Sequence, residues 1–161
     1  MSAVAQPTEV EAFVEAFAQG WRAPNDLERM LAHFTPMLAP DVRLVQPQIP
    51  TLVGHEEFRT GFAEPLFELM PDLHGEVEAW AARGDLVFVQ IRLTGTLAGR
   101  PAGFTSCDRI TLRDGLIAER VAFMDPSPLV TAALTRPRAL PTFARMQARN
   151  VQRRLRKGRH R

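Results

Sequence analysis

Apolar residues recur at helical spacing through the first seventy residues. Positions three and four apart predict helices over residues 8–21, from Asn25 to about Phe34, and over residues 55–70. Pro36 ends the second helix, and Pro65 should kink the third. A short strand over residues 42–45 is expected between them.

From Leu73 onward the apolar period changes to two, which is typical of strands. Four strands are predicted, over residues 73–83, 86–96, 103–113 and 116–124. Gly84-Asp85 and Asp114-Gly115 are predicted hairpin turns, residues 95–103 a glycine-rich loop, and residues 129–134 a last helical turn. We therefore predict an α+β fold with three N-terminal helices on one face of a curved antiparallel sheet.

Asp108 breaks this pattern. It lies in the predicted strand 103–113 and shares its face with Phe104, Ile110 and Leu112. A carboxylate on an apolar wall is costly unless it has a partner or a function. Asp108 is therefore the first candidate for a functional residue.

Composition narrows the class of protein. A chain of 161 residues with 45% hydrophobic and 24% charged residues fits one globular domain. It has no apolar run long enough to span a membrane and no leader pattern, so we expect a cytoplasmic protein. Cys107 is the only cysteine, which excludes an intrachain disulfide and a thiolate zinc cluster, and tyrosine is absent.

The charges are divided unevenly along the chain. Residues 136–161 hold nine Arg, one Lys and no acid, for +10, whereas residues 1–135 carry −8. We divide the chain into a domain over residues 1–134 and a basic tail over residues 135–161, partly helical or disordered. The tail could contact an acidic surface, a nucleic acid or an anionic membrane, but it contains no nucleic-acid motif. We favour a solvated tail lying on the acidic body.

Several segments together resemble the SnoaL-like polyketide cyclase branch of the nuclear transport factor 2-like superfamily. The resemblance covers about residues 8–130 and rests on the order and spacing of short motifs. These are Phe13-Val-Glu-Ala-Phe17, Asp41-Val-Arg-Leu44, Gly54-His-Glu-Glu-Phe58, Met70-Pro-Asp-Leu73, residues 84–96 and Arg113-Asp-Gly-Leu-Ile-Ala-Glu119. The resemblance implies a cone-shaped sheet around an apolar pocket, and a homodimer formed through the outer face of the sheet.

The resemblance implies catalytic roles for Asp108 and Arg120. In polyketide cyclases of this superfamily the pocket aspartate is a general acid/base, and Arg120 occupies a position where a histidine commonly faces the cavity. A strict two-residue turn at Asp114-Gly115 would place Arg120 on the opposite face from Asp108. A one-residue bulge at Gly115 would bring the two together. The sequence leaves both registers open, and with them the choice between a free acid and half of an ion pair.

Two chemistries of the superfamily do not fit this chain. Gln46 occupies the position of the isomerase base, and an amide cannot take up a proton; the pocket tyrosine is missing as well. The positions matched to the epoxide hydrolase residues are apolar, namely Ile91, Leu93 and Ala122. Cyclase-type chemistry remains, because it can run on Asp108 alone.

Aromatic and polar side chains complete the candidate ligand site. Its predicted lining consists of Phe17, Trp21, His33, Gln46, Trp80 and Met124. His33, His55 and His74 lack metal-binding spacing, so we predict neither metal nor cofactor. We predict acid/base chemistry of cyclase or isomerase type on a small cyclic or polyketide-like ligand; the alternative is a non-catalytic small-molecule-binding or dimerisation module.

Overall fold

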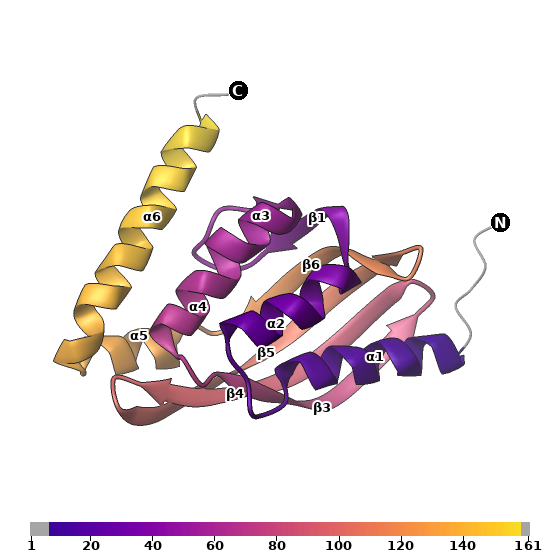
Figure 1. Cartoon of the computed structure of the whole chain (residues 1–161), viewed down its shortest axis with the longest axis horizontal. Coiled ribbons are helices and arrows are strands. Elements are labelled where there is room, and N and C mark those ends of the chain that lie inside the picture. The colour runs from indigo at the N-terminus through magenta and orange to yellow at the C-terminus, as the bar shows by residue number, and fades with distance from the viewer. Residues whose placement is uncertain (1–6, 159–161) are drawn as a thin grey trace.

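A six-stranded sheet carries the first helices on one of its faces (Figure 1). The computed structural model describes residues 7–158. The strands, in the order in which they lie side by side, are β2 (Leu52–Val53), β1 (Leu38–Val45), β6 (Leu116–Met124), β5 (Arg100–Arg113), β4 (Leu86–Leu97) and β3 (His74–Arg83).

The helical segments fall into an N-terminal group and a C-terminal group. The first group is α1 (Pro7–Trp21), α2 (Leu27–Phe34), η1 (Thr35–Met37), α3 (Gly54–Phe58), η2 (Arg59–Ala63) and α4 (Glu64–Leu69). The second group is α5 (Ser127–Leu134), η3 (Pro137–Ala139) and α6 (Leu140–Gly158). The predicted α+β class with a curved sheet is confirmed. One strand pair differs from the predicted antiparallel arrangement, because β1 lies parallel to β6.

The predicted loop over residues 95–103 is instead a hairpin. Strands β4 and β5 continue to Leu97 and Arg100, which face each other across the turn Ala98-Gly99. Both turn residues have positive φ, 51° and 78°, which fits the twist of the flanking strands. The glycine content is therefore not a sign of a loop. Gly103, for example, lies inside β5, where an added Cβ would come within 2.7 Å of the Leu93 carbonyl oxygen.

The predicted third helix is divided into three pieces. A π-helical turn, η2, separates α3 from α4, and Pro65 lies in the first turn of α4. Proline is tolerated at that point because the first turn of a helix needs no N–H donor there. The π turn brings Phe62 and Ala63 into the core.

The core lies between the inner face of the sheet and the helices. Alternate residues of β4 are almost fully buried, with Val87, Val89 and Ile91 at 0% exposure. Phe17 of α1 and Phe34 of α2 pack edge to face over this wall, their ring centroids 5.5 Å apart. The inner face of β4 is fully apolar. A polar residue on the inner face of the neighbouring strand must therefore find its hydrogen-bond partner among the other inward-facing side chains of the sheet.

Residues 140–158 of the predicted tail form the helix α6, which lies beside the α3–α4 segment (Figure 1). Lys157 contacts Glu57 at 2.8 Å near the far end of this helix. Burial raises the pKa of the Glu57 carboxyl, but hydrogen bonds from Lys157 and from the Val53 N–H outweigh that effect, so the pKa lies below its ordinary value. Across residues 7–158, none of the helices has the length and apolar character that crossing a bilayer requires.

Asp72 connects the end of α4 to the sheet. Its carboxylate accepts hydrogen bonds from the Thr96 N–H at 2.6 Å and the Thr96 hydroxyl at 2.7 Å. The Thr96 hydroxyl, with its N–H, lowers the pKa of Asp72 below its ordinary value of 3.8. A lowered pKa means that the folded state favours the ionised form, so the stabilisation is present at neutral pH and is lost as the carboxylate is protonated.

We predict that Asp72→Asn lowers the free energy of unfolding by about 1 kcal/mol at neutral pH, a small value because the carboxylate is exposed. The difference in unfolding free energy from the wild type should reach its full value above about pH 4. It should shrink as the pH falls through the folded-state pKa of Asp72. Urea unfolding at several pH values measures it. Asp85→Asn is the control, because the Asp85 carboxylate has no donor within residues 7–158. A loss that is equal at all pH values would contradict the assignment.

Candidate functional site

A bulge in β6 decides which way Arg120 points. Next to the Asp114-Gly115 turn, Arg113 faces Leu116 and Leu112 faces Ile117, but the next pair is Thr111 with Glu119. Ala118 is thus the extra residue, and it shifts the remaining register by one. Arg120 then faces Ile110 on the inner side of the sheet instead of Arg109 on the outer side. Of the two registers that the sequence leaves open, the structure has the bulged one, with the extra residue at Ala118 and not at Gly115.

Asp108 and Arg120 form an ion pair inside the protein. Arg120 Nε donates to Asp108 Oδ2 at 2.6 Å. The Ser106 hydroxyl donates to the other carboxylate oxygen, Oδ1, also at 2.6 Å. Asp108 is 0% exposed and Ser106 is 1% exposed. Both carboxylate oxygens are therefore occupied, and water is excluded from them.

The two Nη atoms of the Arg120 guanidinium are not used in the contact with Asp108. Its side chain is 10% exposed, and its Nη1 and Nη2 atoms have no hydrogen-bond partner among the residues that the structure describes. The guanidinium carbon lies 5.1 Å from the ring centroid of Phe62, a cation–π contact supplied by the π turn η2. Asp108 therefore holds one edge of the guanidinium, and the Nη atoms remain available to a ligand.

A cavity of about 120 Å³ lies against this group. Its wall is mainly apolar. The sheet and the N-terminal half contribute Trp21, Gln46, Pro47, Gln48, Ile49, Phe62, Leu66, Leu69, Leu93, Phe104, Ser106, Arg120, Met124 and Pro126. Helices α5 and α6 contribute Leu129, Val130, Phe143, Met146, Gln147 and Asn150. Arg120 is the one ionised side chain among these lining residues, so the cavity combines an apolar wall with a single fixed positive charge.

Two predicted ligand-binding residues besides Gln46 line this cavity, Trp21 and Met124. Trp21 is 2% exposed, and its indole Nε1 finds no acceptor within the described part of the chain. Gln46 follows β1, where the inward alternation of Val42 and Leu44 brings it to the cavity. An unpartnered donor and an amide thus accompany the Arg120 charge.

The other three predicted lining residues lie elsewhere. Phe17 packs in the core against Phe13 and Phe34. His33 Nε2 lies 2.7 Å from the Ala16 carbonyl oxygen, where it joins α2 to α1. Trp80 is 42% exposed at the β3 edge, in a separate groove beside α1. Their contacts indicate packing of helices and of the sheet edge.

Sequence reasoning missed two contributors to the site. Ser106 is two residues before Asp108, so strand alternation alone places it on the same face. Helix α6 carries no such signal in the sequence, because its contacts with the cavity depend on tertiary docking. In the sequence, Phe143 and Met146 belong to a loose apolar stripe among the arginines of the tail, and such a stripe does not indicate what it packs against.

The chain belongs to the SnoaL-like domain family, whose model matches residues 10–120. The resemblance drawn from the sequence motifs is thereby confirmed. A search among curated protein sequences finds no match. The matched segment contains Ser106, Asp108 and Arg120 but ends before α5 and α6.

Solved structures show the same fold. A protein named as a SnoaL-like polyketide cyclase from Jannaschia sp. CCS1 is 26% identical, with a TM-score of 0.64, over 80% of this chain and 94% of that one. An LEH-like epoxide hydrolase of M. tuberculosis is 16% identical, with a TM-score of 0.62, over 83% and 95% of the two chains. A protein with a ketosteroid isomerase-like fold from Catenulispora acidiphila is 18% identical, with a TM-score of 0.61, over 74% and 89%. The last two, at such low identity, show the fold alone.

We predict that Arg120→Met is strongly destabilising, by roughly 3–5 kcal/mol, because it leaves the Asp108 carboxylate buried without its cation. The double variant Asp108→Asn, Arg120→Met should lose clearly less than the sum of the two single losses. Denaturant unfolding of the four proteins measures the coupling.

The matched control is the exposed pair Arg92–Glu78, which has the same 2.6 Å separation between Nε and a carboxylate oxygen. Because Arg92 is 63% exposed, its removal should cost much less than removal of Arg120. Equal losses at the two sites, or additive losses at the buried pair, would contradict a coupled buried ion pair.

Proposed function

We propose that the protein binds a small cyclic ligand carrying an anionic oxygen in the cavity beside Arg120. The observation that carries this proposal is the orientation of Arg120, which is held at Nε by a buried carboxylate and left unpartnered at both Nη atoms. A guanidinium fork in an apolar wall suits a carboxylate or an enolate, and the surrounding wall suits a ring. Trp21 adds an aromatic side chain to this wall.

Catalysis is the second candidate, and Ser106 is the observation that favours it. Asp108 is not among the lining residues, but Ser106 is, and the Ser106 hydroxyl donates to Asp108. A C–H proton beside a ligand carbonyl would pass to Ser106 Oγ while the hydroxyl proton moves to Asp108 Oδ1. The C–H electron pair would become the enolate, with its charge on the oxygen held by Arg120. This is acid/base chemistry of cyclase or isomerase type.

Non-catalytic binding stays the simpler alternative. Gln46 lines the cavity where a base would be needed, and Ala122, paired with Asp108 across the strands, offers no second carboxylate. Both features support a pocket that holds an anion without taking a proton from it. A polyketide-like ligand fits this proposal if it presents one ring and one anionic oxygen to Arg120.

A homodimer is a further proposal. The outer face of the sheet exposes Phe88 at 39% and Phe123 at 56%, on the strands that flank β5. Cys107 lies opposite Phe123 on this face. An exposed apolar patch of this kind supports contact with a second copy of the chain. A cytoplasmic location and contacts of the tail with another protein stay predictions.

The binding proposal predicts that benzoate binds to the wild type and that Arg120→Lys weakens binding by about tenfold or more. Lysine keeps the charge but loses the two-pronged donor geometry. Isothermal titration calorimetry measures the affinity, with circular dichroism as the check of folding. Arg109→Lys is the matched control, because Arg109 is the next arginine along the strands but lies on the outer face beside Glu119. Equal effects of the two substitutions would contradict the proposal.

The catalytic candidate predicts exchange of the α-protons of 3-oxocyclohexane-1-carboxylate with deuterated water. This one-ring probe joins a carboxylate to an enolisable ketone. Nuclear magnetic resonance should show exchange faster with the wild type than in buffer, and Ser106→Ala should slow it by about a hundredfold with the affinity retained. Binding without any faster exchange would leave the protein as a binding module.

A further inference from the structure

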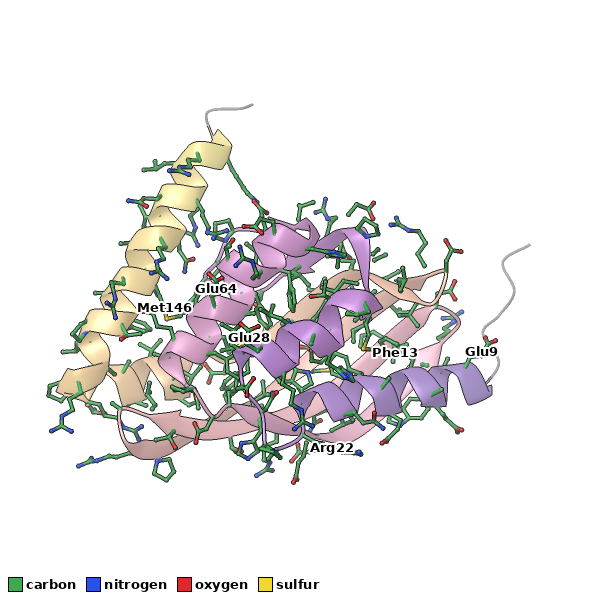
Figure 2. The ribbon with its side chains drawn as sticks, in the orientation of Figure 1. Glu9, Phe13, Arg22, Glu28, Glu64 and Met146 are labelled. Carbon is green, nitrogen blue, oxygen red and sulfur yellow. The ribbon has the colours of Figure 1, made fainter. Side chains whose placement is uncertain are left out.

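Helix α6 forms one wall of the cavity beside Arg120. Its contribution consists of Phe143, Met146, Gln147 and Asn150, whose spacing places them on one side of the helix. Figure 2 shows Met146 on the side of α6 that faces α4. The segment matched by the family model ends at residue 120, so this wall lies outside the matched segment.

Exposed ion pairs and two partly buried apolar side chains, Phe143 and Met146, hold α6 in place. None of its residues is buried. Its near end is tied to α4 through Glu68, which contacts Arg145 and Arg149 at 3.1 Å each, and its far end through the Lys157–Glu57 pair. These partners are exposed to solvent by 30% to 60%, and such pairs contribute little and weaken with salt.

The cavity beneath α6 has room for about one ring. Its volume of about 120 Å³ is close to that of an engineered protein cavity, about 150 Å³, that takes up benzene. Pockets for larger organic ligands have volumes of roughly 300–1,000 Å³. With α6 seated, a ligand of three fused rings is therefore larger than the space that the cavity offers.

We infer that α6 is a displaceable roof that restricts the Arg120 cavity to single-ring anions, and that larger fused-ring anions bind only when α6 is lifted. The inference rests on the proposed function, because it specifies the size of the ligand that Arg120 holds. Met146 and Phe143 determine this size limit by direct contact, and Glu68 determines how readily the roof opens without lining the cavity.

Two carboxylates of different size test the roof, benzoate with one ring and anthraquinone-2-carboxylate with three. The wild type should bind the larger probe at least about tenfold more weakly than benzoate. Glu68→Gln removes the charge that Arg145 and Arg149 of α6 contact. It should therefore strengthen binding of the larger probe by about tenfold and change the affinity for benzoate by less than about threefold. Met146→Ala should also favour the larger probe by widening the cavity.

Glu64→Gln is the matched control. Glu64 lies on α4 one turn before Glu68 (Figure 2). It pairs with Arg59 at 2.9 Å and forms no ion pair with the described residues of α6. It should change neither affinity. The roof would be overturned if the wild type bound both probes with equal affinity, or if Glu68→Gln changed the affinity for both probes equally. Either result would leave Arg120-dependent benzoate binding intact.

A measurement without ligand separates the two proposals. Hydrogen exchange of the α6 amides should be faster with Glu68→Gln than with Glu64→Gln, and should accelerate in the wild type as salt is added. Unchanged exchange would overturn the roof even if benzoate binds. Absence of binding by either probe to every variant would instead remove the proposed function, and the size limit with it.

Discussion

The buried contact between Arg120 and Asp108 is the interaction on which the site depends. Arg120 is the one ionised group on an otherwise apolar or neutral cavity wall, and Asp108 is fully buried behind it. Removing either partner would leave a charge in a medium that does not solvate it. The pair therefore fixes the direction of the guanidinium, and the Phe62 ring covers it from the helical side.

This arrangement changes the role that Asp108 can have. An aspartate alone in an apolar pocket would be a natural acid or base, but here both oxygens already accept hydrogen bonds. Asp108 is better placed to orient Arg120 than to meet a ligand. Proton transfer to it from the cavity would have to pass through Ser106, which makes this hydroxyl the residue that distinguishes a catalyst from a binding protein.

Strand alternation made much of this predictable from the sequence. The burial of Val87, Val89 and Ile91 and the inward position of Asp108 both follow from a period of two. The direction of Arg120 did not follow, because it depends on an extra residue at Ala118, and alanine gives no sign of a bulge. Gly115 suggested a bulge for the wrong position, since its positive φ of 76° belongs to the turn itself.

The docking of α6 could not be predicted from the sequence, because it depends on contacts between residues that are far apart in the chain. The position of α6 depends on Glu57 and Glu68, which precede their basic partners by about 80 to 100 residues. No local pattern connects these residues, so the sequence alone predicts a solvated basic tail. Helix α6 contributes part of the wall of the cavity beside Arg120 and lies outside the segment that the family model matches, so the family match alone does not specify the ligand.

A crystal structure of the wild-type protein with benzoate would test the central claim most directly. We expect the carboxylate within hydrogen-bond distance of Arg120 Nη1 and Nη2, with the ring between Phe62 and Met146 and the Nε contact to Asp108 kept. Benzoate bound away from this cavity, or an Arg120 side chain turned from it to another partner, would show that Arg120 does not hold the ligand.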